Sequence, residues 1–248
     1  MRKFCLEYYE ARHILLDRFD YYDAVAHVIP GAVACLFMLY VLDIVGVPLP
    51  KISEGSFAQV GIGIVVSYVV GHLLQAVAST VEPFYYATWG GKPSINLLEV
   101  QSKTFSDAQR NRLIGDISSY FKVSEILPED KKGKRRFYQR LFERCMALCN
   151  REKLGRVDRF EVSYSFHRVL LTTFALFFLF TLTLKLLICG KWLSIQSDKS
   201  VLLIFLICAT AVGTAIEFFR ARKRAYYYAR EVLWMTADHI RSTTPNLD

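Results

Sequence analysis

The chain lacks the short motifs that mark most hydrolases and nucleotide-binding domains. It contains no HExxH zinc motif, no nucleophile elbow and no recognisable Ser-His-Asp arrangement, so hydrolysis, including hydrolysis within a membrane, is not indicated. Gly90 and Gly91 form a glycine pair, but no GxxxxGK[ST] sequence accompanies them, so a phosphate-binding loop is not predicted. We therefore expect no enzymatic activity, no cofactor and no metal centre.

Paired cysteines and strand-like alternation are also missing. No two of the six cysteines form a CxxC pair, so free, reduced thiols are predicted. Cys145 and Cys149 lie one helical turn apart, but no second Cys or His pair lies nearby to complete a zinc site. No segment alternates apolar and polar residues with a period of two, and no internal repeat is present, so an all-α fold is favoured.

Long apolar runs are abundant instead. Hydrophobic residues make up 53% of the 248 residues, above the roughly 45–50% of a soluble domain. They concentrate in four runs, each about as long as the ~20 residues that cross a hydrocarbon core: Ala24–Val45, Phe57–Val81, Val169–Cys189 and Val201–Phe219. The sequence therefore predicts an all-α membrane protein with four transmembrane helices and a helical cytoplasmic region.

The predicted order begins with an amphipathic interfacial helix over residues 1–22, which is too long and too acidic to open a cleaved signal peptide. Transmembrane helices 1 and 2 follow in residues 23–82, then a basic helical loop in 83–167. Residues 168–219 hold transmembrane helices 3 and 4, and residues 220–248 form a helical tail.

Positive charge orients these segments. Of a net charge of +8, the 83–167 loop carries 16 Lys and Arg against 10 Asp and Glu, and the tail carries six against three. The two other connections, Gly46–Ser56 and Gly190–Ser200, are short and nearly neutral. Because cytoplasmic loops carry an excess of Lys and Arg, both termini and the long loop are predicted to be cytoplasmic.

Four helical segments are predicted in the loop and tail. Ser106 is an N-cap candidate for a helix that reaches about Lys122. A second helix, about Lys134–Leu154, has its buried stripe at Phe137, Leu141, Cys145 and Leu148. After Gly155 the chain is expected to run as a helix straight into the third span. The fourth span is expected to continue into the tail as one helix of about 40 residues, because no Gly or Pro interrupts it before Pro245.

Polar residues interrupt three of the four apolar runs at a similar depth, counted at about 1.5 Å per residue. They are Asp23, His27, His72, Gln75, Ser79, Glu82, Thr214 and Glu217. The third run contributes almost nothing, so it is expected to face lipid. The polar residues either form hydrogen bonds between helices or line a hydrated path, whose acidic inner end would favour cations. A metal site of Asp23, His27, His72 and Glu82 has suitable ligand types but no motif spacing.

Small residues and basic residues supply two further candidate surfaces. Gly63, Ser67 and Gly71 recur every fourth residue, which predicts close packing of another helix, either within the chain or between copies of a homo-oligomer. Basic residues cluster at the start of the second loop helix, at Lys134, Arg135, Arg136 and Arg140. This cluster is either a solvated face or a site for anionic lipid, a nucleotide-type ligand or an acidic partner protein.

The segments AHVIPGAV (26–33) and ARKRAYYYAREV (221–232), together with the polar second span and the basic loop, resemble small bacterial four-span proteins. Some of those are membrane effectors of anti-phage defence systems. The resemblance is architectural and covers most of the chain. It implies an oligomeric channel or membrane-permeabilising effector of the bacterial inner membrane, gated from the cytoplasm by a nucleotide-type ligand or a partner protein. The alternative is a non-conducting membrane anchor or sensor that recruits a cytosolic partner.

Overall fold

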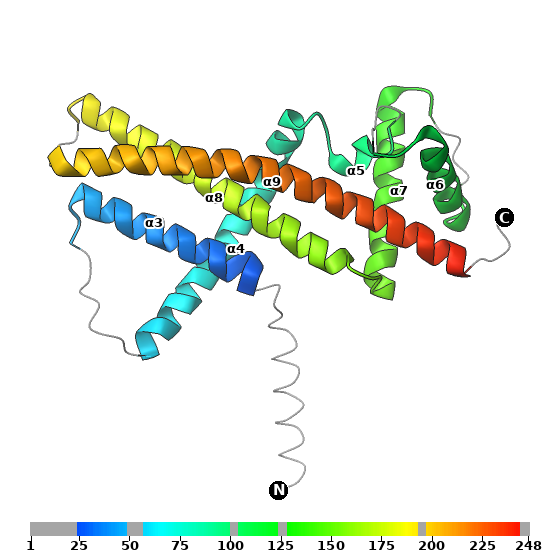
Figure 1. The fold of residues 1–248 in the computed structure, drawn as a ribbon, viewed down its shortest axis with the longest axis horizontal. Helices are drawn as coiled ribbons and strands as arrows, with labels where there is room; N and C mark the ends of the chain where they lie inside the picture. The colour runs from blue at the N-terminus through cyan, green and yellow to red at the C-terminus, as the bar shows by residue number, and fades with distance from the viewer. Residues whose placement is uncertain (1–23, 49–56, 100–103, 124–127, 193–196, 244–248) are drawn as a thin grey trace, which may run out of the picture. The chain divides into compact units, whose positions relative to one another are not determined.

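The computed structural model describes residues 24–48, 57–99, 104–123, 128–192 and 197–243, and all elements in these ranges are helical (Figure 1). The order is a π-helical turn η1 (Ala24–Val28), α3 (Ile29–Val45), α4 (Phe57–Thr88), α5 (Pro93–Asn96), α6 (Asp107–Tyr120), α7 (Lys131–Glu152), α8 (Val157–Cys189) and α9 (Ser197–Thr243). Four stretches, in α3, α4, α8 and α9, are long and apolar enough to cross a membrane, which confirms the predicted all-α fold with four candidate spans. The predicted interfacial helix over residues 1–22 and Asp23 lie outside the described residues.

The chain divides into two compact units. Unit 1 comprises Met1–Thr80 and Ser165–Phe219, and unit 2 comprises Val81–Tyr164 and Arg220–Asp248. The boundaries fall inside α4, α8 and α9, so each of these helices contributes residues to both units. Unit 1 therefore holds the apolar part of each candidate span, and unit 2 holds the basic loop and the tail.

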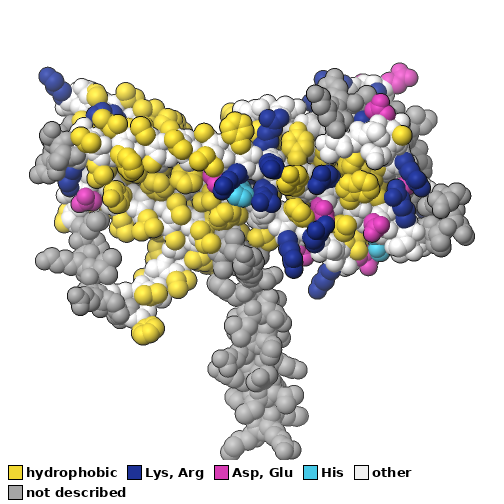
Figure 2. All heavy atoms as spheres, viewed as in Figure 1, with side chains coloured by type: hydrophobic (Ala, Val, Ile, Leu, Met, Phe, Trp, Pro, Cys, Tyr) yellow, Lys and Arg dark blue, Asp and Glu magenta, His cyan; other side chains and the backbone are white. Residues whose placement is uncertain are grey.

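Unit 1 has a small buried core and a large apolar surface. The core consists of Val41, Ile44, Leu184, Leu203 and Leu206, contributed by α3, α8 and α9. Figure 2 shows hydrophobic side chains covering the visible surface of these helices, as expected for a surface that meets lipid. Charged side chains gather instead over the helices of unit 2 (Figure 2).

The third span is more buried within one copy than the second, although the sequence predicted that it faces lipid. In the most apolar stretch of α8, 33% of the residues are buried within the structure, against 11% for α4. Thr173 and Thr181 explain part of this burial, because each hydroxyl donates to a carbonyl four residues earlier in α8, at 2.9 and 2.8 Å. A threonine satisfied in this way needs no water and leaves room for a neighbouring helix.

Two prolines shape the ends of the spans. Pro30 has no amide hydrogen to donate to the carbonyl of residue 26, and the preceding turn η1 is π-helical rather than α-helical. Pro83 lies inside α4, which continues as a helix to Thr88 and so extends beyond the apolar run that ends at Val81.

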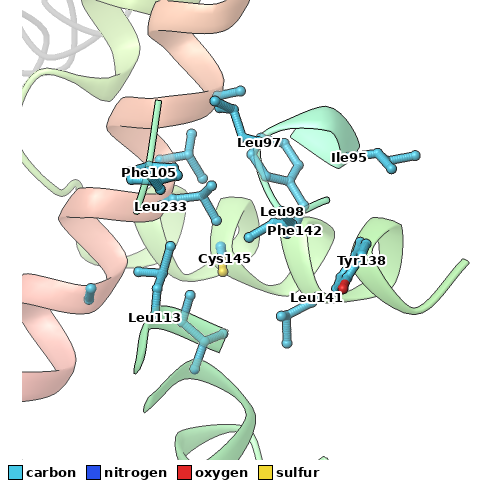
Figure 3. Packing of buried hydrophobic residues seen from close by; sticks show 14 of the residues in the cluster. Ile95, Leu97, Leu98, Phe105, Leu113, Tyr138, Leu141, Phe142, Cys145 and Leu233 are labelled. Atoms are coloured by element: carbon cyan, nitrogen blue, oxygen red, sulfur yellow. The ribbon is translucent and has the colours of Figure 1, made fainter. Parts of the chain in front are cut away.

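Unit 2 is built around a continuous apolar core. Figure 3 shows part of this core, whose residues come from 95–98, α6 and Phe105 before it, α7, the first residue of α8, and α9. The predicted stripe of α7 is buried, since Phe137, Leu141, Cys145 and Leu148 are all at most 5% exposed. This confirms the amphipathic pattern that the sequence predicted for the helix.

The helix ends in unit 2 follow from local side-chain chemistry. α6 begins as predicted, because Ser106 and Gln109 form a capping box. α7 begins three residues earlier than predicted, because the Asp130 side chain caps it by accepting a hydrogen bond from the Gly133 amide at 2.8 Å. α8 and α9 are unbroken, and α9 is 47 residues long, which confirms the predicted continuous helices.

Candidate functional site

His27 and His72, both predicted as polar residues of the spans, meet in unit 1. His27 of η1 is only 5% exposed, and its ring stacks on that of His72 in α4, with centroids 4.0 Å apart and planes at 20°. Tyr68 lies edge-on to His72 at 4.4 Å. Imidazole donates to a metal within the ring plane, so two stacked rings do not aim at one ion. Within the described ranges, no three metal-ligating side chains gather, and the metal alternative gains no support.

A close approach of two backbones holds this histidine pair in place. A Cβ atom added to Gly71 would lie 2.0 Å from the His27 carbonyl oxygen, and one added to Gly31 would lie 1.7 Å from the Ser67 carbonyl oxygen. Gly63, by contrast, has no neighbouring atom within 4 Å of such a Cβ. Of the predicted small-residue face, Ser67 and Gly71 thus pack within the chain, against η1 and α3. Only Gly63 is left open for a contact with another molecule.

The rest of the polar stripe of α4 pairs with α8. Gln75 donates from Nε2 to Ser165 Oγ at 3.0 Å, and Arg168 donates from Nη2 to Ser79 Oγ at 3.4 Å. Ser79 itself donates to the Gln75 carbonyl at 2.9 Å. In a single copy these side chains are therefore bonded between helices, as in the hydrogen-bond interpretation of the sequence.

A hydrogen bond between a histidine and a carboxyl group is buried between α8 and α9 in unit 1. His167 Nδ1 and Glu217 Oε2 are 2.6 Å apart, and the two residues are only 9% and 6% exposed. The sequence identified Glu217 but placed His167 in the loop before the span. The signal that could have identified His167 is its position on the same helix face as Phe160 and Tyr164.

Thr214 and Glu82 have different surroundings from those predicted. The Thr214 hydroxyl donates to the Thr210 carbonyl of its own helix at 2.7 Å. Glu82 belongs to unit 2, where its carboxylate accepts hydrogen bonds from the phenols of Tyr86, at 2.6 Å, and Tyr164. The structure therefore places Glu82 in a tyrosine cluster of unit 2 rather than among the polar groups of unit 1.

The predicted basic cluster divides into separate surfaces. Arg135 donates from Nε to Glu99 Oε1 at 2.8 Å, and this hydrogen bond raises the pKa of the Arg135 guanidinium. Arg136 and Arg140 instead line a hollow of about 400 Å³ with Gln139 and Glu143. Lys134 is half-buried in the first turn of α7 and does not line that hollow. The four residues therefore do not form one binding surface.

The cysteines of the core are inert thiols. Cys149 Sγ lies 3.4 Å from Thr236 Oγ1. Burial raises the pKa of the Cys145 thiol to about 12, and it also raises the pKa of the Cys149 thiol. A thiol that stays protonated at neutral pH is a poor nucleophile. The five cysteines that the structure describes are all free, as predicted.

Known proteins offer no assignment. No protein-family model, no curated protein and no solved structure matches this chain. The resemblance to four-span defence effectors stays a prediction, and the functional argument depends on the geometry of the two units.

Proposed function

We propose that the protein is the subunit of an oligomeric membrane channel or membrane-permeabilising effector, and that unit 2 controls its opening. The observation that carries this proposal is the buried hydrogen bond between the ionisable side chains of His167 and Glu217 in unit 1. An ionisable residue within a span costs about 2.5–3.5 kcal/mol on insertion scales, and such residues commonly mark the paths of ions or protons.

Other polar groups of unit 1 support the same proposal. The histidine pair and the Ser79–Arg168 hydrogen bond lie in the same unit as the His167–Glu217 hydrogen bond. All of these contacts are made within one copy, and in our proposal they belong to a closed state. Opening would exchange them for contacts with water, at little net cost because hydrogen bonds to water replace those between helices.

Several copies would be needed to enclose a path. Four candidate spans are too few to enclose much of a channel, and α4 has a broad exposed apolar surface. Val65, Val69 and Leu73 are 62%, 52% and 63% exposed. In a membrane this surface contacts either lipid or another copy, and Gly63 offers a point of close approach for the second.

Control by unit 2 is supported by helix continuity. α4, α8 and α9 each run without a break from residues of unit 1 to residues of unit 2. A rotation or shift of such a helix in one unit is carried into the other, because a helix is a rigid element. With four spans, the loop and the tail lie on the same side of the membrane. Their excess of Lys and Arg supports a cytoplasmic location for both segments and, for a bacterial protein, insertion in the inner membrane.

A second function is favoured by the same hydrogen bonds. Gln75 and Ser79 are satisfied by residues of α8 within one copy, so their presence requires no water-filled path. A non-conducting anchor or sensor would need only such bonds, with unit 2 recruiting a cytosolic partner.

Ion flux through the purified full chain in planar bilayers distinguishes the two functions. Currents are recorded at applied voltages of either sign, with and without an added nucleoside triphosphate, and we expect conductance in at least one of these conditions. We also expect Glu217→Gln to lower the preference for cations, because it removes a buried carboxyl group from the proposed path. Glu129→Gln is the matched control, since this glutamate is exposed and lies outside the spans.

Two outcomes would count against the channel. Absence of conductance under every condition would favour the anchor. Conductance that Glu217→Gln and Glu129→Gln affect equally would show that the buried His167–Glu217 hydrogen bond does not influence the path.

A further inference from the structure

The exposed apolar side of α9 continues into two cations. Val212, Ile216 and Phe219 are 58%, 48% and 67% exposed, and they follow one another at spacings of four and three residues. Lys223 lies four residues after Phe219, and Arg230 lies seven residues after Lys223, so all five positions share one side of the helix. A lipid whose acyl chains lie along this apolar side would therefore place its headgroup beside the cations.

A tyrosine ring lies next to both cations. The Nζ atom of Lys223 is 5.6 Å from the centroid of the Tyr227 ring, and the Cζ atom of Arg230 is 5.2 Å from it. Both distances fall within the ~6 Å reach of a cation–π interaction. The next acidic residue of the helix, Glu231, is only 8% exposed and pairs with Arg156 at 3.4 Å. Two positive charges are therefore held close together around one aromatic ring.

Position along the helix brings these cations to the level of lipid headgroups. The apolar run ends at Phe219, and Lys223 follows about 6 Å further along the axis, at about 1.5 Å per residue. The headgroup layer is about 5–8 Å thick on each side of a bilayer. Arg230 lies about 10 Å beyond Lys223 along the axis, but its side chain lies over the ring of Tyr227, nearer to the apolar run.

A contact with the end of α4 orients this part of α9. Arg222 donates from Nη2 to the Trp89 carbonyl, just after α4, at 3.5 Å. Trp89 is 2% exposed and stacks on Tyr85, with ring centroids 6.1 Å apart. Consecutive helical residues point about 100° apart, so Lys223 stays exposed while its neighbour Arg222 contacts Trp89. All of these contacts lie in unit 2.

We propose that Lys223, Tyr227 and Arg230 bind the headgroup of an anionic phospholipid. Residues 218–230 hold five Lys and Arg and no Asp or Glu, and such a cluster directly after a span attracts anionic lipids. The two cations contact the phosphate, and the Tyr227 ring holds them in place. The occupant is a lipid rather than a soluble anion because the exposed apolar side of α9 leads directly to the cations. This surface serves a channel and an anchor alike.

The test measures binding of single lipids to the full chain in dodecyl maltoside micelles by native mass spectrometry. Phosphatidylglycerol and phosphatidylcholine with identical acyl chains are the probes, because only the first carries a net negative charge. We expect phosphatidylglycerol to bind at least about tenfold more tightly, since each of the two cations contributes about fivefold. Inorganic phosphate should displace it no more than sodium chloride of the same ionic strength does.

Paired substitutions separate this surface from net charge. Lys223→Gln with Arg230→Gln should weaken binding of phosphatidylglycerol at least about tenfold and change binding of phosphatidylcholine less than about twofold. The matched control, Lys131→Gln with Lys132→Gln, removes the same charge from exposed positions of α7 and should change binding of either lipid less than about twofold. Lys223→Arg with Arg230→Lys keeps both charges and should bind phosphatidylglycerol as the unaltered chain does.

Four results would overturn the proposal: equal affinity of the unaltered chain for the two lipids, equal losses in the α9 and α7 glutamine variants, loss of both lipids together in the α9 variant, or displacement by phosphate beyond the effect of salt. The last would identify a site for a soluble anion instead. No conductance enters these measurements, so this surface and the proposed channel can fail separately.

Discussion

The close crossing of η1 and α3 with α4 predicts that replacing Gly71 destabilises the fold. Gly71→Ala places a Cβ 2.0 Å from the His27 carbonyl oxygen, a separation that real Cβ atoms essentially never show. The obstacle is backbone, so no side-chain rotation relieves it and the helices must move apart by about 1 Å or more. Overpacking a tight interior costs about 1–3 kcal/mol. We expect the upper end, because separation also weakens the stacking of His27 on His72.

Gly63→Ala is the matched control on the same helix. Its added Cβ meets nothing within 4 Å, and alanine is favoured over glycine in a helix by about 1 kcal/mol. The two variants should therefore differ by about 3–4 kcal/mol in the free energy of unfolding. That difference is measured by unfolding each variant in mixed micelles with an increasing mole fraction of a denaturing detergent, with circular dichroism as the signal. If Gly71→Ala is as stable as Gly63→Ala, the two backbones do not approach as described.

Three other predictions concern pH, topology and capping. Burial raises the pKa of Cys145 to about 12 from 9.0, so the folded thiol keeps a proton that the unfolded chain releases. The contribution of Cys145 to the free energy of unfolding should be constant below about pH 8. It should fall above about pH 9, by up to about 1.4 kcal/mol per pH unit, and Cys145→Ala should flatten this slope in denaturant titrations. A cysteine placed at Gln196 should react with an impermeant reagent from outside intact cells, whereas one at Lys132 should not; the reverse labelling would invert the topology. Ser106→Ala should cost about 1 kcal/mol and speed hydrogen exchange in the first turn of α6, since it removes the N-cap acceptor; unchanged exchange would show that the cap is dispensable.

Features that depend on neighbours along the chain were predictable. The four apolar runs identified the candidate spans because length and composition alone decide whether a helix can cross a membrane. The Ser106 cap and the buried stripe of α7 follow from spacings of three and four residues, which a helix places on one side. The same spacing brought His27 and His72 into the candidate set, although not their stacking.

Partners distant in sequence were decided by the tertiary structure. His167 and Glu217 are 50 residues apart, and nothing local to His167 indicates the carboxylate that it meets. Arg135 and Arg136 are adjacent, yet Glu99 contacts the first while the second lines a hollow, because consecutive helical residues point about 100° apart. Gly63 and Gly71 lie on the same predicted face, but only Gly71 reaches the level at which another backbone crosses. Which small or charged residue has a partner depends on where the helices cross in space. The sequence of a single helix does not specify these crossing points.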